Sequence, residues 1–239
     1  MKRIALICLL LPAACGSHTT LSMGQGQAGD NVARAALSGG SPDVALNVSN
    51  AILAEAPDNV PALLSKGDAL SLLRRYDEAE VSYAHALKDD DKSVEAQIGL
   101  GRLSLRTNAR QAQVLFLGAL QHDPSNKVAL NDLGIAYDLQ GDHLKAQESY
   151  RRALGSDPAM HAAEVNLALS MALNGHAPEA VQMLQPLASE PGAPRRLRHD
   201  LAAALAMSGD KEGAAKILSA DMTPDQVQRT LLAYREFNQ

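Results

Sequence analysis

The sequence predicts an all-α fold made of a row of similar helix pairs. Small residues recur along the chain at Gly67, Gly101, Gly134, Ala168 and Ala202, which are separated by 34, 33, 34 and 34 residues. Bulky residues are also spaced 33 or 34 residues apart, at Tyr83, Phe116, Tyr150, Leu184 and Leu218. Several sets of residues that share a period of this length are typical of stacked structural repeats. The 46% of hydrophobic residues include only 3% aromatic ones, and a core of Leu, Ala, Val and Met suits helix packing better than sheet packing.

Segment 127–158 shows how one repeat divides into two helices. Leu130, Leu133 and Tyr137 recur at helical spacing, and Gly141 then interrupts the helix. A second helix follows, and Pro158 cannot continue it. We therefore expect each repeat to be a helix–turn–helix unit, with its small residues at the places where two helices approach closely.

The repeated pattern resembles the tetratricopeptide repeat. Segment 127–158 has the expected residue type at every signature position, namely Leu130, Leu133, Gly134, Tyr137, Ala146, Tyr150, Ala153 and Pro158. The resemblance implies a right-handed superhelix, an α-solenoid of about five helix–turn–helix repeats with a C-terminal capping helix. It also implies a concave face lined by the first helix of each repeat.

The chain divides into four expected parts. Residues 1–14 form a signal peptide, 15–30 a flexible tether, 31–222 the repeat domain and 223–239 the capping helix. Within the domain, the expected units are 31–57, which is degenerate, 58–91, 92–124, 125–158, 159–192 and 193–222. In the last part, Thr223 can cap a helix that begins with Pro224 and presents Val227, Leu231 and Tyr234 on one face.

The first fifteen residues are typical of a bacterial lipoprotein signal. Lys2 and Arg3 precede an apolar stretch, and Cys15 follows two alanines. This arrangement resembles the bacterial lipobox, which implies lipidation of Cys15, palmitate included, and an outer-membrane anchor that faces the periplasm. Pro12 departs from the lipobox pattern, so cleavage by ordinary signal peptidase near the same point is the alternative.

The sequence favours a binding protein over an enzyme. It has no nucleophile elbow, phosphate loop or dinucleotide motif, and its histidines lack metal-ligand spacing. The only cysteines, Cys8 and Cys15, lie in the signal segment. A net charge of −5 offers no basic footprint for nucleic acid. We therefore expect protein partners, with no cofactor, metal, small-molecule substrate or nucleic acid.

The helical phase of the first helices predicts which residues line the concave groove. They are Leu64, Asp68, Ile98, Arg102, Leu105, Asn131, Ile135, Asp138, Val165 and Leu169. Arg195, Arg196 and Arg198 add an expected basic patch near the last repeat. Apolar anchors and arginines are enriched at interfaces, so these residues are the candidate partner contacts. Tetratricopeptide domains that hold acidic chaperone tails use a basic and Asn clamp, and Leu64 and Asp68 at that surface disfavour such a use.

The C-terminal segment resembles one particular group of tetratricopeptide repeat proteins. Residues 195–238 resemble the end of TadD-type proteins of the Flp/Tad pilus assembly system, and the order of signal, tether and repeats is similar. The resemblance implies an outer-membrane-anchored scaffold that helps to assemble or localise a pilus or secretion apparatus. Its partners would be components of that machinery, such as a secretin. The alternative is a general envelope adaptor for peptidoglycan hydrolases or outer-membrane protein assembly.

Overall fold

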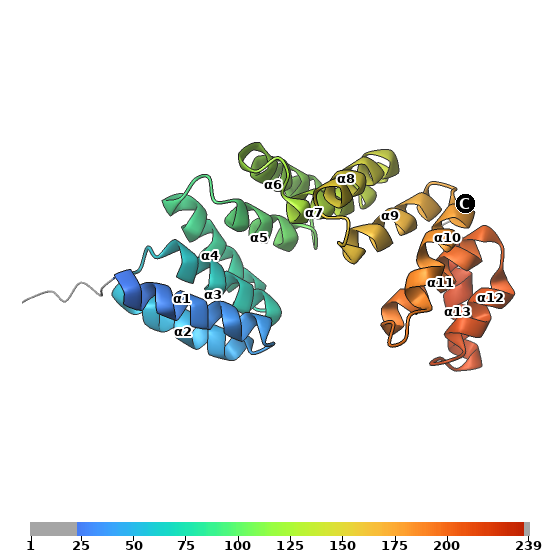
Figure 1. Ribbon diagram of the computed structural model, residues 1–239, viewed down its shortest axis with the longest axis horizontal. Helices are drawn as coiled ribbons and strands as arrows, with labels where there is room; N and C mark the ends of the chain where they lie inside the picture. Colours follow the sequence, from blue (N-terminus) through green and yellow to red (C-terminus); the bar gives the residue numbers. More distant parts are fainter. Residues whose placement is uncertain (1–22, 237–239) are drawn as a thin grey trace, which may run out of the picture.

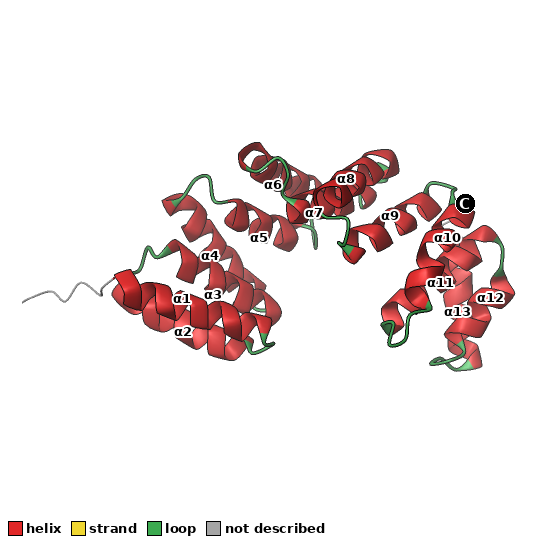
Figure 2. Cartoon of the chain, in the orientation of Figure 1, coloured by secondary structure: helices red, strands yellow, loops and turns green. Residues whose placement is uncertain are grey.

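The computed structural model describes residues 23–236, and over this range the chain forms thirteen α-helices and no strand (Figures 1 and 2). The predicted all-α fold is therefore confirmed. The helices are α1 (Met23–Ser38), α2 (Pro42–Glu55), α3 (Val60–Leu72), α4 (Tyr76–Asp89), α5 (Val94–Ser104), α6 (Ala109–His122), α7 (Lys127–Asp138), α8 (His143–Ser156), α9 (His161–Leu173), α10 (Ala177–Ala188), α11 (Arg195–Ser208), α12 (Lys211–Leu218) and α13 (Pro224–Glu236). Within residues 23–236, none of these helices combines the length and the apolar character that a membrane-spanning helix needs.

The first twelve helices form six antiparallel pairs that stack side by side. Each odd-numbered helix packs against its partner, and consecutive odd-numbered helices also contact one another, from α1 with α3 to α9 with α11. Among the described helices, consecutive even-numbered helices make no comparable contact. Each second helix also contacts the first helix of the next pair. Because successive first helices touch and successive second helices do not, the stack bends around the first helices. Figure 1 shows the resulting arc, in which the first helices line the concave side.

The small residues that recur every 33 or 34 positions lie where a helix contacts an aromatic ring. Phe116 and Tyr150 have 0% and 1% of their surface exposed. A side-chain methyl group built on Gly101 would overlap the ring of Phe116, and one built on Gly134 would overlap the ring of Tyr150. The shared period of small and bulky residues therefore has a direct steric cause, since each ring fills the space that the missing Cβ leaves.

Five of the six turns inside the helix pairs contain a residue with a left-handed backbone, and in one of the five this residue is not a glycine. Gly141, Gly175 and Gly209 adopt left-handed backbone angles, with φ of 79°, 86° and 98°. At the corresponding place between α3 and α4 stands Arg74, with φ of 60°. A residue with a Cβ is strained in this region, so this turn is held by the packing around it rather than by its own preference.

The first helix begins earlier than the sequence predicted. Residues 15–30 were expected to be a flexible tether, but α1 starts at Met23 and includes residues 23–30. A Cβ on Gly29 would lie 2.9 Å from Cδ1 of Ile52, and Asp30 is only 7% exposed. Packing against α2 stabilises this glycine-rich stretch as a helix even though its residues favour helix weakly. The expected signal peptide, Cys15 and the rest of the tether lie outside the described residues.

The C-terminal helix forms where the sequence places it. Thr223 Oγ1 accepts a hydrogen bond of 3.4 Å from the backbone N–H of Gln226, whose side chain in turn accepts one of 2.9 Å from the backbone N–H of Thr223. This reciprocal pair fixes the first turn of α13. Val227 is 6% exposed, and Leu231 and Tyr234 pack beside it against α11 and α12.

Candidate partner-binding groove

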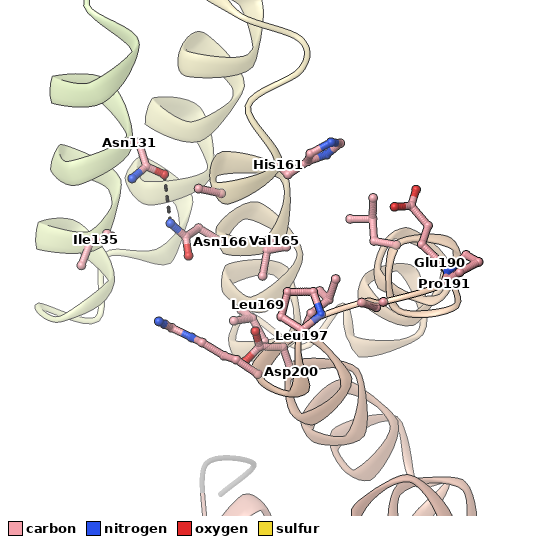
Figure 3. Close-up of a pocket in the computed structure, with 16 residues that line it drawn as sticks. Asn131, Ile135, His161, Val165, Asn166, Leu169, Glu190, Pro191, Leu197 and Asp200 are labelled. Carbon is pink, nitrogen blue, oxygen red and sulfur yellow. Dashed lines mark hydrogen bonds between the residues drawn. The ribbon is translucent and has the colours of Figure 1, made fainter. Parts of the chain in front are cut away.

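A hollow on the concave side lies between α7, α9 and α11. It has a volume of about 590 Å³ and is closed on one side by the loop between α10 and α11 (Figure 3). Asn131, Ile135, Val165 and Leu169, which the sequence assigned to the groove, line it. Arg196, which the sequence assigned to the basic patch, lines it as well. We call this hollow the α9 groove.

The floor of the α9 groove is apolar and belongs to the protein core. Val165, Leu169 and Leu197 are half-buried and pack on the core residues of α9 and α11. Ile135 contributes from α7 and Leu187 from α10. A hollow of several hundred cubic ångströms with an apolar floor and a few polar groups is the usual form of a ligand site.

Two asparagines form the polar wall of the α9 groove. Asn166 Nδ2 donates a hydrogen bond of 2.9 Å to Asn131 Oδ1, as Figure 3 shows, and Asn131 Nδ2 donates one of 3.0 Å to Asp132. Arg102 Nε in turn donates to the other oxygen of Asp132 at 2.5 Å. The polar chain therefore runs through α5, α7 and α9 and holds the amide of Asn166 in place beside the apolar floor.

Arg102 and Asp68 line a second, smaller hollow of about 390 Å³ among α3, α4 and α5. Arg106 lies in the same hollow, with its guanidinium carbon 3.6 Å from the ring centre of Tyr76. Asp68 accepts a 2.6 Å hydrogen bond from the Tyr83 hydroxyl. The structure thus places four of the ten predicted groove residues in the α9 groove and two, Asp68 and Arg102, in the second hollow.

Asp138 is not available as a groove contact in the way that the sequence suggested. Its carboxylate accepts hydrogen bonds from the Tyr150 hydroxyl at 2.9 Å and from Ser170 Oγ at 2.7 Å, and it lies 2.8 Å from His143 Nδ1. Burial and the neighbouring carboxylate raise the pKa of Tyr150 far above its ordinary value. Because its acceptor sites are already engaged, Asp138 joins α7, α8 and α9 instead of facing a partner.

Ile98 is a second residue that was predicted to line the groove but does not, and two predicted leucines are only partly exposed. Ile98 is 7% exposed and packs in the core with Leu130 and Leu133. Its helical phase is the same as that of Asn131 and Val165, which line the α9 groove, so its place in the core follows from the packing around α5 and not from its phase. Leu64 and Leu105 are half-buried against core clusters and line neither hollow described above.

The three arginines of the expected basic patch do not act together. Arg195 and Arg198 form ion pairs with Asp221 at 2.8 and 3.8 Å, and His199 Nε2 lies 2.9 Å from the same carboxylate. The hydrogen bond from His199, with the two arginines, lowers the pKa of Asp221. Asp221 neutralises part of the patch, and only Arg196 turns to the α9 groove.

One group of metal-ligand type was missed by the sequence analysis. Asp58, His85 and Asp89 place one ligand atom each within 4.8 Å of one another. His85 Nε2 lies 3.2 Å from a carboxylate oxygen of each aspartate, and 76% of the Asp58 side chain is exposed. The i, i+4 spacing of His85 and Asp89 on α4 was the available signal. The arrangement is a solvent-accessible cluster in which one histidine lies between two carboxylates, and such exposed polar contacts contribute little to stability.

Comparison with known proteins agrees with the repeat assignment. Models described as tetratricopeptide repeat match residues 33–93 and 128–160. A probable UDP-N-acetylglucosamine–peptide N-acetylglucosaminyltransferase, SPINDLY of Solanum lycopersicum, is 36% identical over 80 residues, which are 33% of this chain and 9% of that protein. SPINDLY of Arabidopsis thaliana is 34% identical over 91 residues, or 38% of this chain and 10% of that protein. The chain spans about a tenth of the length of these relatives.

Solved structures share the fold over most of the chain. PilW, described as a widely conserved type IV pilus biogenesis factor, has a TM-score of 0.74 and 20% identity over 87% of this chain and 98% of its own. Pseudomonas aeruginosa pilF has a TM-score of 0.69 and 17% identity over 90% of this chain and 96% of its own. A tetratricopeptide repeat protein from Parabacteroides merdae has a TM-score of 0.66 and 16% identity, with coverages of 90% and 86%. The chain thus has the fold of a tetratricopeptide repeat superhelix.

Proposed function

We propose that this tetratricopeptide repeat superhelix is a non-enzymatic, lipid-anchored scaffold that binds protein segments in its concave face. It would assist the assembly or localisation of a Flp/Tad-type pilus or secretion apparatus, with a component such as the secretin as partner. The α9 groove is the observation that carries the binding role. It combines a half-buried apolar floor with an ordered pair of amides, and such a surface suits an extended chain with apolar side chains.

Support for the pilus role comes from two independent sides. A protein of similar fold, PilW, is described as a widely conserved type IV pilus biogenesis factor. The C-terminal residues 195–238 of this chain resemble TadD-type proteins. In this proposal the segment before α1 carries the anchor at Cys15 and holds the groove close to the outer membrane on its periplasmic side. Confinement near the membrane raises the effective concentration of the scaffold for its partners.

A photo-crosslinker in the α9 groove tests the proposal in cells. His161 is exposed and lines the groove, so a benzophenone amino acid at this position should capture a pilus or secretion component. His122 is an exposed histidine at the end of α6 that lines neither hollow, and it serves as the matched control. Equal capture of the component from both positions, or none from either, would contradict the proposed role.

A general envelope adaptor is the second candidate, because the same groove could hold segments of other envelope proteins. Capture of a peptidoglycan hydrolase or of an outer-membrane assembly factor at His161, without a pilus component, would favour it. The anchor is tested separately: Cys15→Ala should release the protein from the membrane fraction. Unchanged fractionation of that variant would argue against lipidation at Cys15.

A further inference from the structure

We propose that the α9 groove selects a partner segment with a lysine or arginine flanked by apolar side chains, and that Asp200 receives the cation. This inference rests on the proposed binding role of the groove and adds its specificity. Asp200 lies on α11, on the side that faces α9, among the residues that line the groove (Figure 3). It is not among the groove residues predicted from the helical phase.

Asp200 makes no hydrogen bond and no ion pair with the side chains that the structure describes, those of residues 27–234. It is half-buried, and its charged neighbours Arg196 and His199 act on its carboxylate without contacting it. Two nearby carboxylates, Asp132 and Asp221, are engaged by arginines at 2.5 and 2.8 Å. A partly buried carboxylate without a donor is unfavourable in an isolated protein, so a donor from outside fits this position.

The surroundings of Asp200 combine a low-polarity floor with a negative balance of charge. Leu197 is three residues before it on the same helix, and Leu169 lines the groove from α9. Desolvation by these surroundings raises the pKa of the Asp200 carboxyl, although Arg196 opposes the shift. The charged lining residues are Asp200, Glu190 and Arg196, with His161 beside them, so carboxylates outnumber guanidinium groups. A cation is therefore the complementary charge, and apolar side chains next to it can cover the leucines.

Arg196 does not satisfy Asp200 internally. The two residues are four apart on α11, where side chains can meet, but no ion pair of 4.0 Å or less joins them. An incoming lysine would occupy the space between Asp200 and the apolar floor. Because it would be removed from water there, its hydrogen bond to the carboxylate should contribute more than an exposed ion pair does.

The test uses three acetylated, amidated peptides, Gly-Ser-Leu-X-Leu-Ser-Gly, in which X is lysine, norleucine or glutamate. Titration calorimetry with the protein should give a Kd for the lysine peptide about tenfold lower than for the norleucine peptide. Asp200→Asn should reduce this ratio to below about twofold while the norleucine peptide binds as before. Asp200→Lys should reverse the preference towards the glutamate peptide.

Glu148→Gln is the matched control, because Glu148 is an exposed carboxylate on α8 that does not line the groove. It should leave all three affinities unchanged, and the far-ultraviolet circular dichroism of each variant reports whether it is folded. Binding of the norleucine peptide with no preference for lysine would overturn the role of Asp200 and leave the proposed groove intact. Binding of none of the three peptides to the wild-type protein would count against both.

Discussion

Arg102 of α5 donates a 2.5 Å hydrogen bond from Nε to Asp132 of α7 and thereby joins the first helices of two consecutive repeats. The Asp132 side chain is only 6% exposed, whereas that of Arg102 is 55% exposed. Asp132 also holds Asn131, whose amide oxygen receives Asn166. An arginine that the sequence assigned to partner contact therefore also orders the polar wall of the groove.

Arg102→Met should lower the free energy of unfolding by about 1–2 kcal/mol, because Asp132 would then be a buried carboxylate without its cation. Methionine keeps the alkyl packing of the arginine stem. Urea denaturation followed by circular dichroism measures the effect, and Arg102→Met combined with Asp132→Asn should recover part of the loss. If the single variant unfolds at the same urea concentration as the wild type, the pair contributes nothing to stability.

Gly134→Ala should destabilise the protein by about 1–3 kcal/mol, because the new methyl group would overlap the ring of Tyr150. Gly155→Ala on α8 is the matched control, since a Cβ there has nothing within 4 Å. Because alanine favours helix over glycine, the control should stabilise the protein by up to about 1 kcal/mol. Thermal unfolding of the two variants should move in opposite directions, and a shift in the same direction would contradict the ring-contact explanation.

Arg74→Gly should stabilise the turn between α3 and α4, because glycine adopts a φ of 60° without the strain of a Cβ. The expected gain is about 0.5–1 kcal/mol, after the added freedom of glycine in the unfolded chain is subtracted. The neighbouring Arg75 has a φ of −89° and pairs with Glu78, so Arg75→Gly should instead destabilise. Urea midpoints of the two variants give the comparison; a loss of stability in Arg74→Gly would show that the arginine side chain supports the turn.

Alkaline pH should destabilise the protein through Tyr83 and Tyr150. Burial and the carboxylates of Asp68 and Asp138 raise the pKa of these two phenols above the ordinary value of 10.0. The unfolded chain ionises first, so the stabilisation is complete below about pH 10 and is lost as the pH rises above it, at up to about 1.4 kcal/mol per pH unit for each tyrosine.

The variant with Tyr83→Phe and Tyr150→Phe tests the pH dependence. It should be less stable than the wild type at pH 7, because two hydroxyl–carboxylate hydrogen bonds are lost. Its free energy of unfolding should fall less steeply between pH 10 and about pH 11.5. Tyr137→Phe is the control, since Tyr137 is half-buried and its hydroxyl makes none of these bonds. Parallel pH profiles for the double variant and the wild type would contradict the assignment.

The apolar residues of the groove were predictable because they follow the repeat. Ile135 and Leu169 are 34 positions apart and occupy equivalent places on α7 and α9, so the helical period alone orients them. Ile98 occupies the place equivalent to Asn131 and Val165, which line the groove, yet its own side chain packs in the core. The helical period alone therefore could not separate it from them. The helical phase of α7 predicts that Asp138 faces the groove. Its carboxylate instead accepts hydrogen bonds from Tyr150 and Ser170, and these depend on where α8 and α9 place their hydroxyl groups.

The sequence by itself determined the helix pairs, their period and the terminal helix. These follow from local pattern: the ring of Tyr150 needs Gly134, the turn after α7 needs Gly141, and Thr223 caps α13. Only the tertiary structure decided that α1 begins at Met23 and that Asp221 neutralises two of the three arginines. It also decided that Asp200 makes no hydrogen bond or ion pair with the described side chains. The physical reason is that these features depend on distances between side chains of different helices, and such distances are set by the packing of the whole superhelix.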